Sequence, residues 1–125
     1  MVLLVHHREP VRRVLAAALQ VLGRPVISTA SAEQALALLE DSRHSFQLLI
    51  TANLLTGMNG PELARRFRTA AGPTAPVIML SAYERPPEGA SDAFFWEPAD
   101  VDEITRKAAQ LMDMAVPAGS DWPRS

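Results

Sequence analysis

The sequence predicts a single α/β domain built on a doubly wound parallel sheet of five strands. Short, wholly apolar runs alternate with segments in which apolar residues recur every three or four positions. The first pattern is typical of strands buried on both faces, and the second of amphipathic helices. Strands that alternate with helices pair in parallel through right-handed crossovers. The 125 residues suit one domain of ordinary size.

Three strands and two helices are expected in the first half of the chain. Val2–Val5 is the first apolar run. Pro10 then stands where a helix begins, a position at which its missing N–H costs little, and Gly23 ends that helix. Ser31 caps the next helix together with Gln34. The remaining elements of this half are strands over residues 26–29 and 47–51 and a helix over residues 31–39.

In the second half, Pro61 begins a helix, and strands are expected over residues 77–80 and 93–96. Asp100 starts a last helix that runs to about residue 114. Twelve residues separate the last two strands and include Pro86, Pro87 and Gly89. Because prolines remove N–H donors and disfavour helix before them, the fourth helix is expected to be a single turn or absent. Residues 1–114 form the domain, and residues 115–125 are expected to be a flexible tail.

Composition excludes several classes of function. The chain has no cysteine, which rules out disulfides and cysteine-zinc sites. A net charge of −2 gives no basic footprint for nucleic acid. The opening apolar run is too short for a signal peptide or a membrane span. A cytoplasmic protein with no membrane or nucleic-acid partner is therefore expected.

Four stretches of the chain resemble the response-regulator receiver domain, as in the chemotaxis regulators. They are VLLVHHREP at residues 2–10, LLITANLLTGMNG at 48–60, VIMLSA at 77–82 and EPADVDE at 97–103. Their order and spacing carry the resemblance, which covers residues 2–114. It implies a flavodoxin-like fold with strand order 2-1-3-4-5 and a role in two-component phosphorelay signalling.

The departures from that family fall on its chemistry. His6 and His7 stand where the family has a pair of acids, and Glu97 where it has a lysine. Counting back eight residues from Gly60 places the phosphoacceptor aspartate at Ala52. By the same resemblance, two residues tied to switching keep their type, the hydroxyl of Ser81 and the aromatic ring of Phe94.

These substitutions predict a degenerate receiver, or pseudo-receiver, that is not phosphorylated. Ala52 offers no nucleophile, and two imidazoles do not supply the hard oxygen ligands that magnesium prefers. Glu97 would repel a transferring phosphoryl group. We therefore expect no enzyme activity, no cofactor and no bound metal. The expected partner is a protein of a two-component system, either a sensor kinase or an output protein.

A ligand- or metal-sensing domain that uses His6, His7 and Glu97 is the alternative, since these are ligand types suited to zinc. Adjacent side chains should point apart at a strand end, which disfavours a shared ion. A contact between Glu97 and one of the two histidines is the structural expectation. Flavin mononucleotide is excluded, because the loop after the first strand lacks the glycines of a phosphate-binding loop.

The last strand predicts a contact surface. Phe94 and Trp96 share one face and Phe95 points to the other. With the fourth helix missing, Tyr83 and the Pro86-Pro87 segment are the only cover expected over that face. Either the loop folds back over these rings, or a partner or second copy of the chain docks on Tyr83, Phe94 and Trp96.

Overall fold

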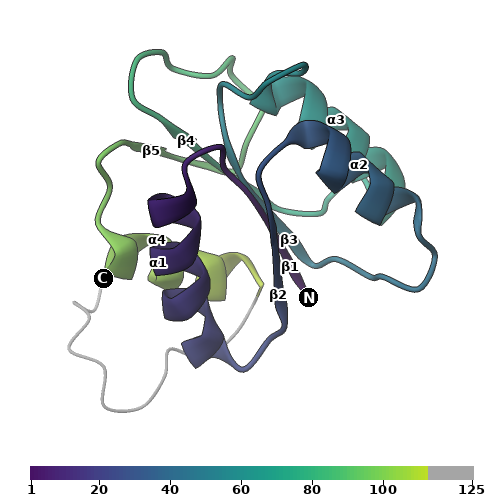
Figure 1. The fold of residues 1–125 in the computed structure, drawn as a ribbon, viewed down its shortest axis with the longest axis horizontal. Coiled ribbons are helices and arrows are strands. Elements are labelled where there is room, and N and C mark those ends of the chain that lie inside the picture. The colour runs from purple at the N-terminus through teal and green to yellow at the C-terminus, as the bar shows by residue number, and fades with distance from the viewer. Residues whose placement is uncertain (113–125) are drawn as a thin grey trace.

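The computed structural model describes residues 1–112 and contains one five-stranded parallel sheet (Figure 1). The strand order is β2-β1-β3-β4-β5, as expected for a doubly wound flavodoxin-like fold. The strands are β1 (Val2–Val5), β2 (Val26–Thr29), β3 (Leu48–Ala52), β4 (Val77–Ser81) and β5 (Ala93–Trp96).

Helices cover both faces of the sheet (Figure 1). α1 and α4 lie on one face, and α2 and α3 on the other. The first core cluster contains Leu15, Leu80 and Ile104, and the second contains Leu3, Phe67 and Met79. The helices are α1 (Glu9–Leu19), continued by the 3₁₀ turn η1 (Gln20–Leu22), α2 (Ala32–Glu40), α3 (Gly60–Ala71) and α4 (Val101–Leu111).

The helix ends follow their sequence signals. Gly23 closes η1 in the left-handed conformation, with φ of 72°. The side chains of Ser31 and Asp100 accept hydrogen bonds from the first turns of α2 and α4. Asn59 caps α3 in the same way by accepting from the Glu62 N–H, a role that the sequence analysis missed. The expected end of the last helix at residue 114 and the tail at 115–125 lie outside the described residues.

Within residues 1–112, β4 connects to β5 without a helix. The helix that the fold would place between these two strands is therefore absent, as expected, and the label α4 belongs to the helix after β5. The connecting loop is instead held by side chains from its surroundings. Arg68 of α3 donates to the Gly89 carbonyl at 3.2 Å and to Asp92 Oδ2 at 2.9 Å. The same Asp92 oxygen accepts the backbone N–H of Val77 at 2.8 Å. The loop is therefore tied at its far end to α3 and to the start of β4.

The aromatic residues of β5 take the expected faces. Phe94 packs on the cluster beneath α2 and α3, and Phe95 on the cluster beneath α1 and α4. The Phe94 and Trp96 rings meet edge to face, with centroids 4.8 Å apart. The guanidinium of Arg85 lies 5.3 Å from the Phe94 centroid. The expected cover by Tyr83 is wrong, because Tyr83 is 88% exposed and Arg85 takes that place.

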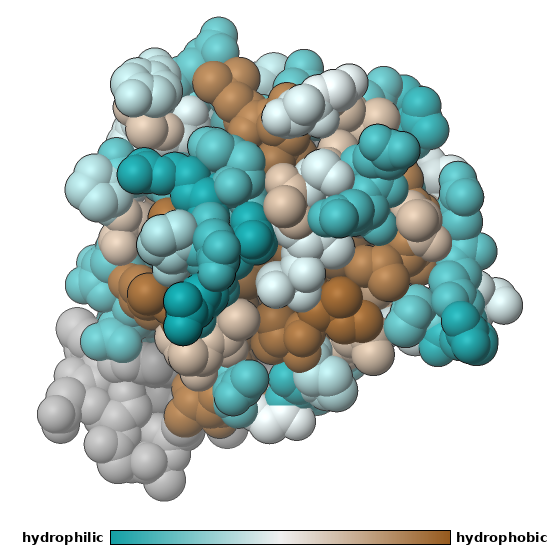
Figure 2. Space-filling view, in the orientation of Figure 1, coloured by the Kyte–Doolittle hydropathy of each residue, from teal (hydrophilic) through white to brown (hydrophobic). Residues whose placement is uncertain are grey.

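The surface is mixed in character. Figure 2 shows apolar side chains in several separate areas, interrupted by polar ones, on the face of the molecule drawn in Figure 1. No helix within residues 1–112 combines the length and the apolar character required to cross a lipid bilayer.

Candidate functional site

An open cleft of about 630 Å³ lies at the carboxyl ends of the strands. This is the end at which open α/β sheets carry their sites. Among residues 1–112, two of the five large apolar side chains left exposed, Leu54 and Tyr83, line this cleft. Glu97 is the one carboxylate in the lining. The complete lining is His7, Arg8, Ala52, Leu54, Leu55, Thr56, Leu80, Ser81, Ala82, Tyr83 and Glu97.

His6, at the end of β1, is fully buried beside this cleft and bonds to Glu97. Its Nε2 lies 3.0 Å and 3.2 Å from the two carboxylate oxygens of Glu97. Its Nδ1 accepts the backbone N–H of Arg8 at 3.1 Å. Because Nδ1 is an acceptor, the ring proton sits on Nε2 and is donated to the carboxylate. The expected contact between Glu97 and one histidine therefore forms through His6.

The histidines stack on each other. Their ring centroids are 4.8 Å apart and the ring planes are inclined by 17°. The expectation that adjacent side chains point apart is therefore wrong here, because the chain leaves the strand geometry after Val5. His7 is exposed, yet partial desolvation and then its electrostatic interaction with His6 lower its pKa from the ordinary 6.5.

Metal binding finds little support in this arrangement. Among residues 1–112, no group of three or more histidine, aspartate or glutamate side chains is placed to hold a metal ion. Both ring nitrogens of His6 are already hydrogen-bonded, Nε2 to Glu97 and Nδ1 to the backbone N–H of Arg8, so neither is available to bind a metal. The metal-sensing alternative therefore lacks a ligand set in the described part of the chain.

The environment of Glu97 favours its ionised form. The hydrogen bond from His6 is the largest cause of a pKa lowered from the ordinary 4.5, partial burial opposes it, and nearby positive charges, including Arg8, add to it. The Glu97 side chain is 18% exposed. The folded protein therefore holds Glu97 as a carboxylate that accepts a hydrogen bond from His6 Nε2.

Glu97→Gln should weaken the acid dependence of stability. Because the folded-state pKa of Glu97 lies below its unfolded value, its contribution is complete above about pH 4.5. The contribution is lost as pH falls through the folded-state pKa. Glutamine can still accept from His6 Nε2 but does not titrate. We expect the unfolding free energy of the wild type to fall more steeply below pH 4.5 than that of the variant, as measured by urea titration.

His7 adds a second pH effect to this experiment. Its lowered pKa also reduces stability on acidification, beginning below its ordinary 6.5. That effect lies at higher pH, and it is larger in the variant, because the charge of Glu97 raises the His7 pKa and glutamine carries no charge. Stability curves that stay parallel from about pH 5 to about pH 3 would contradict the role given to Glu97.

Position 52 presents only a methyl group to the cleft. Ala52 ends β3 and is 2% exposed. The neighbouring Thr51 is fully buried, and its hydroxyl donates to the Ala52 carbonyl at 3.0 Å. Ser81 Oγ accepts the Glu84 N–H at 3.1 Å, and Asn53 Nδ2 donates to the Glu84 carbonyl at 3.3 Å. The hydroxyl and the amide therefore fix the turn after β4.

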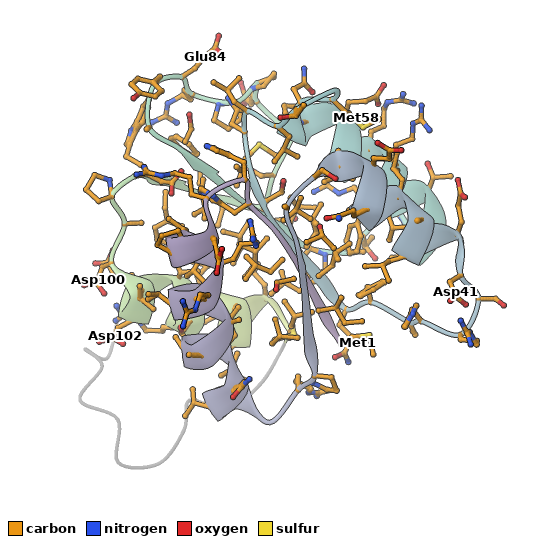
Figure 3. All side chains as sticks on the ribbon, viewed as in Figure 1. Met1, Asp41, Met58, Glu84, Asp100 and Asp102 are labelled. Carbon is orange, nitrogen blue, oxygen red and sulfur yellow. The ribbon has the colours of Figure 1, made fainter. Side chains whose placement is uncertain are left out.

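Asn53 was missed in the sequence analysis. Its signal was a polar residue placed directly after a buried strand, where it is 5% exposed. Figure 3 shows Glu84, the partner of both Ser81 and Asn53, at the outer limit of the loop between β4 and β5. The turn that carries Tyr83 is thus anchored from two strands at once.

Similarity to known proteins agrees with this architecture. The family model described as "Response regulator receiver domain" matches residues 2–94. The virulence sensor protein BvgS of Bordetella bronchiseptica is 34% identical over 119 residues, which cover 85% of this chain and 9% of that protein. The chain thus spans about a tenth of the length of the curated relatives it matches.

Solved structures show the same fold. The receiver domain of the hybrid histidine kinase CckA is 31% identical, with a TM-score of 0.76, and the match covers 89% of this chain and 97% of that one. A signal receiver domain from Pseudomonas fluorescens is 26% identical, with a TM-score of 0.78 and coverage of 90% and 93%. On the family match and these likenesses, the chain belongs to the response regulator receiver domains of two-component signalling.

Proposed function

We propose that this receiver domain accepts no phosphoryl group and signals through protein contacts. The observation that carries the proposal is the state of the cleft. Ala52 offers a methyl group at the predicted phosphoacceptor position, and the one carboxylate of the lining, Glu97, is bonded to His6. No side chain of the lining combines a nucleophile with an activating base, which covalent transfer requires.

The proposal assigns each residue of the site a changed role. His6 and His7 stand for the acid pair, and their imidazoles form a stack and a buried hydrogen bond in place of a magnesium shell. Glu97 stands for the lysine and carries the opposite charge. Ser81 and Phe94 stand for the switch residues. Ser81 is engaged by Glu84 N–H, and Phe94 lies beneath Arg85, which supports a domain held in one state.

The protein is expected to ignore phosphodonors. Acetyl phosphate with magnesium should leave the intact mass unchanged, and beryllofluoride with magnesium should leave tryptophan fluorescence unchanged. Ala52→Asp should behave in the same way, because His6, His7 and Glu97 still withhold the metal ligands and the neutralising charge.

A combined variant is the positive control. Ala52→Asp, His6→Asp, His7→Asp and Glu97→Lys together restore every residue type that the chemistry needs, and circular dichroism checks that this variant folds. Stable phosphoryl uptake by the wild type, on any side chain, would overturn the proposal. Uptake by Ala52→Asp alone would overturn the roles given to the two histidines and Glu97.

The partner in this proposal is a protein of the same signalling system, a sensor kinase or an output protein. The relatives support this class of partner, since their names describe a sensor protein and a hybrid histidine kinase. The proposed contact surface is the aromatic surface made of Tyr83, Phe94 and Trp96. Tyr83 is 88% exposed and Trp96 48% exposed, and aromatic side chains are enriched at protein contact sites.

A further inference from the structure

The cleft at the carboxyl ends of the strands is apolar both at its base and at its edge. Ala52 and Leu80 are register partners on β3 and β4, and their buried side chains form the base. Leu54 and Tyr83, in the segments that follow the same two strands, are exposed and form the edge. Small-molecule sites are typically concave and largely apolar, with a few polar groups that orient the ligand. The cleft volume of about 630 Å³ lies within the usual range of such sites.

Hydrogen bonds join the two segments that form this edge. Asn53 Nδ2 donates to the Glu84 carbonyl at 3.3 Å, which ties the segment that carries Leu54 to the segment that carries Tyr83. The Gly60 N–H donates to the Asn53 carbonyl at 2.7 Å, which ties the first of these segments to α3. Because the edge is already held in place, a ligand that binds there orders little of the chain and loses less free energy to conformational entropy.

A cation and an anion line the same cleft without pairing with each other. Arg8 is exposed, and within residues 1–112 no carboxylate lies within ion-pair distance of its guanidinium. The pKa of Glu97 is lowered first by the His6 hydrogen bond and also by the charge of Arg8, so the two charges lie near each other. A carboxylate that accepts one hydrogen bond keeps the capacity to accept more. Both charged groups are therefore available to a ligand.

We propose that the cleft binds a free α-amino acid with a large apolar side chain. Its α-carboxylate pairs with Arg8, its α-ammonium with Glu97, and its side chain lies on the apolar base between Leu54 and Tyr83. An α-amino acid carries its two charges on groups attached to one carbon atom, which suits a cation and an anion that are close but unpaired. The guanidinium fork of arginine matches the geometry of a carboxylate. This inference goes beyond the proposed protein-contact function and does not depend on it.

Ser81 adds an unused hydrogen-bond donor to the same site. It is buried and lines the cleft, and its Oγ accepts the Glu84 N–H at 3.1 Å. In the part of the chain that the structure describes, no acceptor lies within reach of the Ser81 hydroxyl hydrogen. A hydroxyl in this state can donate to an anion, and partial exclusion of water strengthens such a bond. Its hydrogen is available to the α-carboxylate of the ligand.

Ligands with a single charge suit the cleft less well. An apolar anion would pair with Arg8 but bring its charge close to Glu97, and an apolar cation would be repelled by Arg8. The end of a peptide carries either the ammonium or the carboxylate, and so leaves one of the two groups without a partner. A free amino acid is a small ligand that pairs with both charges of the cleft.

A chemical-shift titration of the isotope-labelled full chain by NMR tests this inference, with L-phenylalanine and L-leucine as probes. We expect saturable binding with Kd of about 0.1–1 mM, as suits a small ligand in an open cleft. The shifts should be centred on residues 52–56 and 80–83. The compound 3-phenylpropanoate lacks the ammonium, and 2-phenylethylamine lacks the carboxylate. Each should bind at least about tenfold more weakly than phenylalanine.

Two substitutions assign the charges. Arg8→Gln should weaken the binding of phenylalanine at least about tenfold, so that phenylalanine and 2-phenylethylamine bind alike. Glu97→Gln still accepts from His6 but carries no charge, and it should make phenylalanine and 3-phenylpropanoate bind alike. Arg13→Gln is the matched control, because Arg13 is an exposed arginine of α1 that does not line the cleft. It should bind phenylalanine as the wild type does.

The titration of the wild type needs no substitution, so the inference remains testable if a variant fails to fold. Absence of saturable binding of both amino acids up to about 10 mM overturns the inference. So do shifts centred outside the cleft, and so does 3-phenylpropanoate that binds as tightly as phenylalanine. None of these results touches the proposed function. Phosphoryl uptake by a chain that binds phenylalanine would contradict the proposed function alone.

Discussion

Gly60→Ala should lower the unfolding free energy by about 2–3 kcal/mol. A Cβ atom at this position would lie 2.4 Å from the carbonyl oxygen of Ala52 and 3.0 Å from Asn53 Cα. Both neighbours are backbone atoms, so neither can move aside as a side chain would. The Gly60 N–H donates to the Asn53 carbonyl at 2.7 Å, which holds the first residue of α3 against the end of β3. Accommodating the methyl group requires these two elements to separate.

The steric effect and the helix propensity of alanine have opposite signs at this position, so the measurement distinguishes between them. Gly60 has an ordinary helical conformation, and helix propensity by itself favours alanine over glycine there. Chemical denaturation of the two proteins measures the difference. Gly23→Ala is the control, because Gly23 has φ of 72° and nothing within 4 Å of an added Cβ. That variant should lose only about 1 kcal/mol, from backbone strain. Equal losses in the two variants would argue against the steric account of Gly60.

Asp92→Ala should destabilise the protein by about 2–3 kcal/mol. One oxygen of Asp92 accepts both the Val77 N–H at 2.8 Å and Arg68 Nη2 at 2.9 Å. Val77 is fully buried, so its N–H would lose its partner without gaining water. Arg68 would lose the charge-assisted bond that ties α3 to the end of the loop. The two bonds of Asp92 hold the loop between β4 and β5, which has no helix to pack it against the sheet.

Two further variants separate these contributions. Asp92→Asn keeps an oxygen for Val77 N–H and loses only the charge toward Arg68, so about 1 kcal/mol is expected. Glu88→Ala removes an exposed acid from the same loop and should change stability by less than about 0.5 kcal/mol. Thermal and urea unfolding measure all three. A loss in Asp92→Ala no larger than that in Glu88→Ala would show that the loop is held elsewhere.

Much of the fold could be predicted because each element carries a local signal. Val2–Val5 is apolar throughout, Gly23 ends η1, and Asp100 caps α4. The absent helix between β4 and β5 followed from Pro86 and Pro87, whose effect on helix is local and independent of tertiary structure. The strand order came from the family resemblance, since the strands themselves do not encode which neighbour they pair with.

The site was only partly predictable, because its contacts join distant segments. The pairing of Glu97 with a histidine could be expected, but the choice of His6 depends on how the chain turns after β1. The stacking of His7 on His6 depends on the same turn. The tie between Arg68 and Asp92 spans 24 positions, and neither residue type identifies the other. Contacts of this kind depend on how the whole chain packs, so local sequence patterns do not predict them.

The bond between His6 and Glu97 also bears on the order in which the chain folds. The two residues are 91 positions apart in the sequence. Closing so long a loop for one hydrogen-bonded pair is entropically unfavourable. The parallel strands must therefore bring β1 and the end of β5 together before this bond can form. We therefore expect the His6–Glu97 bond to be a late contact in folding, made after β1 and β5 have joined the same sheet.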